Sequence, residues 1–309
     1  MGISKKVFFY KEKARLNYFL FSFAFFFFFS CLVIQMASSL RAQDVRPEPD
    51  WPKKITLGFV PYIEPEKVVE KYQPLIEHLE KTLGLKLETI VPDNYIKIIA
   101  AMKTRKIEFA YFGPLSYVQA HRQTGAEVLA LELNEDGNPG YHALIIASRA
   151  GGIQSMDQAQ GKVLAFTDPD SASGYLVPLV YFIRTRKQTP ASFASRIVFA
   201  GSHMAVVKGV AKGEFDVGAT NTKDLVRSSS ALGLSPDQFN VLWKSELVPG
   251  SPIAARKDIP NSLKKAFLDA LTSFNQNKAT LEKMHVGGYI PAKDTDYDLI
   301  RELESMKSK

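Results

Sequence analysis

The sequence predicts an α/β protein of two lobes. Short apolar runs of strand length alternate with longer stretches in which apolar residues recur at helical spacing. Such alternation is typical of parallel sheets covered by helices on both faces. Two turn-rich segments, 134–140 and 246–252, bracket the middle of the chain. We therefore expect one lobe from 52–140 together with 250–309, a second lobe from 141–249, and two crossings between them.

The first lobe is expected to begin with a strand over 55–61. A helix follows whose apolar face runs from Val68 to Leu83 and which ends at Gly84. Pro74 lies within that helix and is expected to delay its start or to kink it. A second strand is predicted at 85–91. The next expected elements are helices at 95–102 and 115–123 and strands at 107–112, 128–133 and 141–147.

The second lobe repeats the alternation. An amphipathic helix from Leu263 to Leu271 then returns the chain to the first lobe. The expected strands cover 163–167, 196–200, 215–220 and 240–243. The expected helices between them cover 173–185, 203–211 and 222–231.

Residues 1–43 have the pattern of a signal peptide or a membrane anchor. Basic residues precede an apolar run over 16–36, and small residues follow it. Cleavage near 39–42 is the favoured outcome, with 44–53 as a linker. The run is about 20 residues long, which is enough to span a bilayer, so an uncleaved anchor is the alternative. Lipidation at Cys31 is less favoured, because Phe stands where Leu is usual.

Charge and cysteine content exclude several classes of protein. The formal net charge is +7, but residues 1–43 hold six Lys and Arg against one Glu, which leaves only +2 for the rest. The exported part therefore has no basic stripe for nucleic acid. Cys31 is the only cysteine and lies in the leader. We expect no disulfide, no thiolate metal site and no cysteine nucleophile in the mature chain.

A polar turn at 168–178 joins an apolar strand to a helix and predicts an anion site. Ser171 and Ser173 stand where N-caps are preferred, and Gly174 allows a ligand to approach the backbone closely. The first N–H groups of a helix lack partners and lie at the positive end of its dipole. A plain capped helix is the alternative. Pro178 removes a backbone donor, so we expect an irregular first turn.

Five short segments occur in a specific order along the chain: 73–80 (QPLIEHLE), 110–114 (AYFGP), 168–178 (DPDSASGYLVP), 201–203 (GSH) and 213–219 (GEFDVGA). Each motif is weak alone, and the order and spacing together are specific. With these motifs in order, the chain resembles the periplasmic phosphate/phosphite/phosphonate-binding proteins of ABC importers, a branch of the type 2 periplasmic-binding-protein fold. The resemblance covers roughly 54–285.

The resemblance implies a set of ligand-binding residues. Phosphorus oxygens would be held at the start of the helix after Asp168, by side chains and by backbone N–H groups. Relatives usually carry a hydroxyl residue between the two serines, and Ala172 departs from that, so only its N–H remains. The tyrosines in the set would reach in from the other lobe or the hinge. The implied set is Tyr95, Tyr141, Ser171, Ala172, Ser173 and His203.

The resemblance also implies two specificity positions. In relatives that take aminoalkyl phosphonates, acidic side chains meet the ligand's ammonium, and here those positions hold Lys223 and Ser251. A buried ammonium without a carboxylate partner costs several kcal/mol. We expect 2-aminoethylphosphonate to bind poorly, phosphite or methylphosphonate to bind well, and phosphate to depend on an acceptor for its extra hydroxyl. A placement wrong by one residue, or a solvent-facing Lys223, is the alternative.

The expected function is that of a periplasmic receptor that closes on a small phosphorus oxyanion and presents the closed form to an ABC permease. We expect no catalysis and no cofactor, and membrane contact only through the leader or the permease. One alternative is a membrane-anchored sensing module of the same fold. Another is a serine hydrolase using Ser171 or Ser173 with His203, although no Gly-x-Ser-x-Gly elbow is present.

Several other polar residues are expected to be structural. Asp168 and Asp170 are interpreted as solvated turn carboxylates. Tyr111 and Phe112 are interpreted as pocket wall and not as hydrogen-bonding partners. Three histidines lack metal-ligand spacing and are placed on a helix surface, near a helix end and in the tail. They are His78, His121 and His285.

Overall fold

The computed structural model describes residues 47–307 of the chain. The expected leader, including Cys31, lies outside the described residues. The described residues belong to one compact unit, Val45–Lys309. No helix in the described part combines the length and the apolar character needed to cross a membrane.

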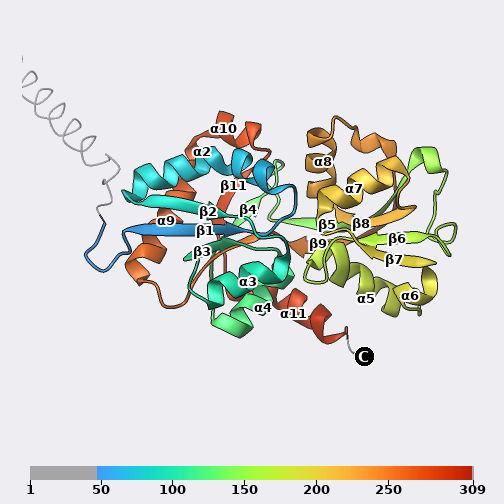
Figure 1. Ribbon diagram of the computed structural model, residues 1–309, viewed down its shortest axis with the longest axis horizontal. Helices are drawn as coiled ribbons and strands as arrows, with labels where there is room; N and C mark the ends of the chain where they lie inside the picture. Colours follow the sequence, from blue (N-terminus) through green and yellow to red (C-terminus); the bar gives the residue numbers. More distant parts are fainter. Residues whose placement is uncertain (1–46, 308–309) are drawn as a thin grey trace, which may run out of the picture. The chain divides into compact units, whose positions relative to one another are not determined.

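The first lobe is built on a six-stranded sheet (Figure 1). The strand order is β11-β4-β10-β3-β1-β2; the neighbouring pairs β2–β1 and β1–β3 are parallel, and the pairs β3–β10, β10–β4 and β4–β11 are antiparallel. Its strands are β1 (Lys54–Phe59), β2 (Lys86–Ile90), β3 (Phe109–Tyr111), β4 (Glu127–Leu133), β10 (Pro252–Ala255) and β11 (Gly288–Pro291). Its helices are α2 (Pro65–Leu83), α3 (Tyr95–Lys103), α4 (Pro114–Thr124), α9 (Asn261–Ser273), α10 (Lys278–Lys283) and α11 (Asp298–Ser305).

The second lobe is built on a five-stranded sheet of order β7-β6-β8-β5-β9, and Figure 1 shows its helices on both faces of the sheet. Its strands are β5 (Gly140–Ser148), β6 (Val163–Phe166), β7 (Arg196–Phe199), β8 (Val217–Asn221) and β9 (Phe239–Pro249). Its helices are α5 (Val177–Arg184), α6 (Pro190–Phe193), α7 (His203–Lys212) and α8 (Thr222–Ala231). The chain crosses between the sheets from β4 to β5 and from β9 to β10.

The expectation of parallel sheets is met in only part of each sheet. Strand β5 pairs antiparallel with both β8 and β9, and β10 pairs antiparallel with both β3 and β4. These strands carry the two crossings. Strand β5 enters the second lobe and β9 leaves it at the same end, so the two strands run in opposite directions. The same holds for β10, which enters the first lobe, and β4, which leaves it. Hydrophobic periodicity indicates that a strand exists but not its direction.

Core packing accounts for the strand β5 and the long helix α2. Leu144 and Ile146 lie in one buried cluster while Ile145 and Ala147 lie in another, so successive residues of β5 face opposite layers.

Helix α2 begins at Pro65 and runs through Pro74 without a break, so the expected late start is wrong. Proline is tolerated at a helix start, and buried packing on both sides of Pro74 outweighs the lost hydrogen bond. The helix ends at Gly84, as predicted.

Candidate functional site

A narrow cavity lies between the two lobes. Its free volume is about 20 Å³, which matches roughly one water-sized sphere. The cavity brings together all six residues expected to bind ligand, which are Tyr95, Tyr141, Ser171, Ala172, Ser173 and His203. It is also lined by Tyr62, Tyr111, Asp224 and Ser251.

Four helix starts converge on this cavity. Tyr95 is the first residue of α3, Pro114 of α4, and His203 of α7, and Ala172 opens the irregular turn that precedes α5. A helix N-terminus carries partial positive charge and N–H groups without intrahelical acceptors. Four of them around one small space bring N–H donors and partial positive charge to it without a cationic side chain.

The serine motif forms a capped, irregular helix start. Ser171 is the N-cap, and its Oγ accepts a hydrogen bond of 3.0 Å from the Gly174 N–H. Ala172–Leu176 form a π-helical turn before α5, so the expected irregular first turn is confirmed. The Oγ of Ser173 accepts from Asn221 Nδ2 at 3.0 Å. Because each serine oxygen is used as an acceptor, each hydroxyl hydrogen is available to donate to an anion.

His203 is buried and held by hydroxyl groups. Its Nδ1 lies 3.1 Å from Thr220 Oγ1 and 3.3 Å from Thr167 Oγ1, and its Nε2 lies 3.6 Å from Asp224 Oδ2. Burial lowers the pKa of His203, and the Asp224 carboxylate opposes that effect only in part. The ring of the empty protein is therefore mainly neutral near pH 7 and carries a single N–H.

The two tyrosines in the expected ligand set are neutral donors. Burial, reinforced by the charge of Asp224, raises the pKa of both Tyr95 and Tyr141. Tyr95 comes from α3 of the first lobe and Tyr141 from β5 beside the crossing. Their hydroxyls stay protonated at any physiological pH and supply donors from outside the serine helix.

The expectation of solvated turn carboxylates is wrong for Asp168. Asp168 is 6% exposed, and its Oδ1 accepts from the Asp170 N–H at 2.8 Å. Burial raises its pKa. The Oδ1 of Asp170 accepts from Gln119 Nε2 at 2.9 Å, and Gln119 belongs to α4 of the first lobe. Aspartates are common in exposed turns, but this turn contacts the first lobe through Gln119, so Asp168 is buried.

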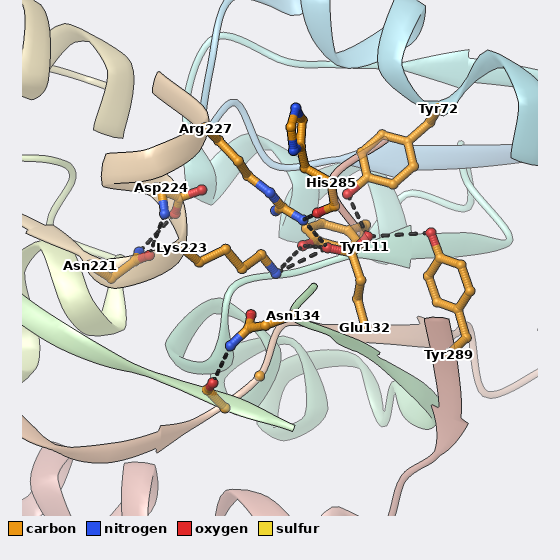
Figure 2. A network of polar contacts seen from close by, with 12 residues as sticks. Tyr72, Tyr111, Glu132, Asn134, Asn221, Lys223, Asp224, Arg227, His285 and Tyr289 are labelled. Carbon is orange, nitrogen blue, oxygen red and sulfur yellow. Dashed lines mark hydrogen bonds and ion pairs between the residues drawn. The ribbon is translucent and has the colours of Figure 1, made fainter. Parts of the chain in front are cut away.

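Lys223 does not face solvent, and it does not line the cavity. Its Nζ lies 3.0 Å from Glu132 Oε1 and donates to the Tyr111 hydroxyl at 3.1 Å (Figure 2). Tyr111 lines the cavity, as expected, but its hydroxyl also donates to Glu132 Oε1 at 3.1 Å, so the expectation that it is not a hydrogen-bonding partner is wrong. The ammonium lies behind Tyr111 and Tyr141, within 5.9 Å of both ring centroids. Ser251 does line the cavity.

Glu132 is the centre of a buried network that joins the lobes. It lies on β4 of the first lobe and is 1% exposed, while Lys223 and Arg227 reach it from α8 of the second lobe. Arg227 Nη2 lies 2.9 Å from Glu132 Oε1. The hydroxyls of Tyr72 and Tyr289 donate to Oε2 at 2.7 and 3.3 Å (Figure 2). The one feature of the sequence that could have indicated this network is Glu132 itself, an acidic residue flanked by apolar residues inside its strand.

The network keeps Glu132 ionised. Burial alone would raise the pKa of Glu132, but Lys223 and Arg227 outweigh it and hold the pKa far below its usual range. The pKa of Lys223 is nevertheless lowered, first by burial and then by Arg227. The two shifts are consistent because one carboxylate is shared between two cations, which leaves the cations only partly compensated.

The three histidines expected to be structural have local partners. The Nε2 of His78 lies 3.0 Å from the Ala270 carbonyl, and the Nδ1 of His121 lies 2.8 Å from the Ala126 carbonyl. The ring of His285 contacts Glu135, and its carbonyl accepts from Arg227 Nη2 at 2.8 Å. His285 therefore supports the network and is not simply part of the tail. The described residues hold no cluster of three potential metal ligands.

A methyl group at position 174 should disrupt the serine turn. A Cβ there would lie 2.3 Å from Thr167 Oγ1 and 2.9 Å from Ser171 Oγ. Overpacking of this kind costs about 1–3 kcal/mol and moves the capping serine. We expect Gly174→Ala to lower the melting temperature and to weaken ligand binding. Gly151→Ala, where a Cβ meets no atom within 4 Å, is the control and should change neither; equal behaviour of the two variants would contradict the prediction.

Two α/β lobes with a small cavity lined by hydrogen-bond donors between them are typical of two-lobed solute receptors. The chain belongs to the family of periplasmic substrate-binding proteins of phosphonate ABC transporters, whose sequence model matches residues 57–297. The protein is thus of the class that binds solute for an importer.

Known relatives agree with this assignment. The chain is 29% identical over 262 residues to the phosphonates-binding periplasmic protein of Escherichia coli, covering 82% of this chain and 77% of that protein. It is 29% identical over 273 residues to the phosphate-import protein PhnD of Mycolicibacterium smegmatis, covering 81% of this chain and 85% of that protein.

Solved structures share the fold. One is a phosphonate-transporter binding protein of Pseudomonas aeruginosa, with a TM-score of 0.78, 24% identity and coverage of 83% of this chain and 87% of that one. Another is PhnD1 of Prochlorococcus marinus in complex with methylphosphonate, with a TM-score of 0.73, 22% identity and coverage of 84% and 99%. At these identities the likeness establishes the two-lobed α/β fold.

Proposed function

We propose that the protein binds a small phosphorus oxyanion, phosphite or an alkylphosphonate such as methylphosphonate, in the cavity between its lobes. The observation that carries the proposal is the convergence of four helix starts on one small cavity lined by Ser171, Ser173 and His203. Hydrogen bonds to a charged group contribute about 1.5–3 kcal/mol each, so a few of them supply micromolar affinity after ordering costs.

The two lobes are the units that move during binding. We assign 52–140 with 250–309 to one unit and 141–249 to the other. Donors in the cavity come from both lobes, so the full set is assembled only when they close. Closure excludes water and strengthens each hydrogen bond, and the permease then receives the closed form. Reopening is sufficient for release, so the cycle needs no covalent chemistry.

Asp224 determines which protonation state of the ligand fits. Its carboxylate lines the cavity beside His203. Burial would raise the pKa of Asp224, but the charges of Arg227 and Lys223 and the hydrogen bond from Asn221 hold that pKa below the usual range. An ionised carboxylate only accepts hydrogen bonds, so it repels a bare phosphorus oxygen and accepts from a P–OH group. The preferred ligand therefore carries one protonated oxygen. Phosphate then finds an acceptor for one hydroxyl.

The size of the cavity and the position of Lys223 disfavour aminoalkyl ligands. The tail of such a ligand would lie near Ser251, which offers no charge, and near an ammonium already held by Glu132. We expect 2-aminoethylphosphonate to bind at least tenfold more weakly than methylphosphonate in a competition titration. Ser251→Asp should recover part of that difference. Tighter binding of the aminoalkyl ligand to the parent protein would refute this specificity.

We also propose that the protein performs no catalysis. The Oγ of Ser171 accepts from the Gly174 N–H, and the Oγ of Ser173 accepts from Asn221 Nδ2. Both contacts are structural. Incubation with a serine-reactive fluorophosphonate tests the hydrolase alternative, because covalent labelling of Ser171 or Ser173 would establish a nucleophile. N-terminal sequencing of the exported protein separates the receptor from the anchored sensing module, since only the receptor loses its leader.

The function itself is tested by calorimetry. The leader-less protein is titrated with phosphite, methylphosphonate, phosphate and sulfate under identical conditions. We expect one-to-one binding of at least one phosphorus oxyanion at micromolar or lower concentration. Absence of heat with every phosphorus oxyanion at millimolar concentration would exclude the function.

A further inference from the structure

A second hollow between the lobes has no role in the site described above. It is a groove of about 480 Å³, here named the lysine groove, between α2 of the first lobe and α8 of the second. Lys67 and Lys71 of α2, Arg227 of α8 and Lys283 of α10 line it. Among the described lining residues, Glu70 is the only carboxylate, and it is exposed.

Buried donors of the lysine groove lack acceptors. Within the described part of the chain, the Nζ of Lys71, the Nε and Nη1 of Arg227 and the hydroxyl of Tyr62 are buried and have no hydrogen-bond partner. Arg227 and Tyr62 are 7% and 4% exposed. Arg227 donates through Nη2 to Glu132 (Figure 2), and its Nε and Nη1 have no acceptor among the described residues. Buried polar groups are normally hydrogen-bonded, so these donors indicate a missing acceptor.

The charges around the groove also favour an anion. Lys223 and Arg227 share the carboxylate of Glu132, the buried Nζ of Lys71 has no partner within the described residues, and Asp224 faces the first cavity. Burial, followed by the charge of Arg227, lowers the pKa of Lys71. A bound anion would relieve both effects, because it supplies the opposite charge and the acceptor atoms together.

We propose that the lysine groove is a second anion site, which takes a small multivalent oxyanion of the phosphate or pyrophosphate class. Lys71 supplies one side of the site from the first lobe and Arg227 the other from the second. Lys67 Nζ already reaches across to the Ala231 carbonyl at 3.3 Å. An anion held by both lobes binds the closed form better than the open form, so it strengthens ligand binding in the first cavity, and the ligand strengthens anion binding equally.

Tyr62 separates the two sites, since it lines both cavities. The probe is pyrophosphate, which is too large for the first cavity in its closed form. We expect calorimetry of the leader-less protein, without methylphosphonate, to give one bound pyrophosphate per chain. His203→Ala should leave that binding within twofold, whether or not the first cavity binds phosphorus oxyanions. Lys71→Met should weaken it at least tenfold, and Lys71→Arg should keep it.

The matched control is Lys81→Met, an exposed lysine on the same helix, which should bind pyrophosphate like the parent. Lys71→Met also removes an uncompensated buried ammonium, so its melting temperature without anion should rise by about 2–4 °C. Pyrophosphate should then stabilise the parent but not this variant. Three results would each overturn the proposal: no binding by the parent, equal binding by Lys71→Met, or pyrophosphate binding lost in His203→Ala.

Discussion

Replacing Glu132 by Gln should weaken binding of the phosphorus oxyanion by roughly 100-fold, equivalent to about 3 kcal/mol. Glu132 belongs to the first lobe, and it compensates Lys223 and Arg227, which belong to the second. These pairs form only when the lobes are together. Without the carboxylate, closure would bury two cations that have no counter-ion, so the free energy of closing becomes less favourable and the affinity falls.

The matched control is Glu127→Gln on the same strand. Its Oε2 lies 2.7 Å from Lys264 Nζ on α9, so that ion pair lies within the first lobe. The control should keep the parent affinity, even where its melting temperature changes slightly. Calorimetry with methylphosphonate measures both variants. An equal loss in the two would show that charge on β4, and not the contact between lobes, governs binding.

Replacing His203 by Ala should weaken binding by about 1.5–3 kcal/mol, or at least tenfold. The pH dependence carries more information. Burial lowers the pKa of His203 in the empty protein, and an anion against the ring raises it. Binding is therefore accompanied by proton uptake. Affinity is highest below the lowered pKa of the ring in the empty protein, and it falls as the pH rises from that pKa to the higher pKa of the ring in the complex.

The comparison protein for this effect is His203→Gln, measured over about pH 5 to 8. Titration of the ligand itself, and of its contact with Asp224, occurs in both proteins and cancels in the ratio of their dissociation constants. The dissociation constant of His203→Gln divided by that of the parent should be largest at acid pH and smaller at alkaline pH. A ratio that does not change with pH would show that the ring stays neutral in the complex.

The local part of the site could be predicted from the sequence. Ser171, Ser173 and the irregular turn caused by Pro178 follow from short-range rules for helix caps and proline, and these rules act within a few residues. The strands of the alternating α/β pattern were placed by the same kind of reasoning. The expected strand at 240–243 is shorter than β9, because the later residues of β9, up to Pro249, are partly exposed and lack an apolar run.

The charged network could not be predicted, because its members are distant in the sequence. Glu132 and Arg227 are separated by 95 residues, and only the fold brings them together. Lys223 illustrates the consequence. Its position suggested a cation that faces the ligand, whereas its ammonium is turned to a carboxylate of the other lobe. Strand direction failed for a similar reason, since it depends on where the chain crosses between sheets.

The most direct test of the central claim is a crystal structure of the leader-less protein with methylphosphonate. The account predicts phosphorus density in the cavity between the lobes, with its oxygens within hydrogen-bonding distance of Ser171 Oγ, Ser173 Oγ, the Ala172 N–H and His203 Nε2. Glu132 should remain paired with Lys223 in that complex. Phosphorus density in the lysine groove alone, with the serine turn unoccupied, would contradict the account.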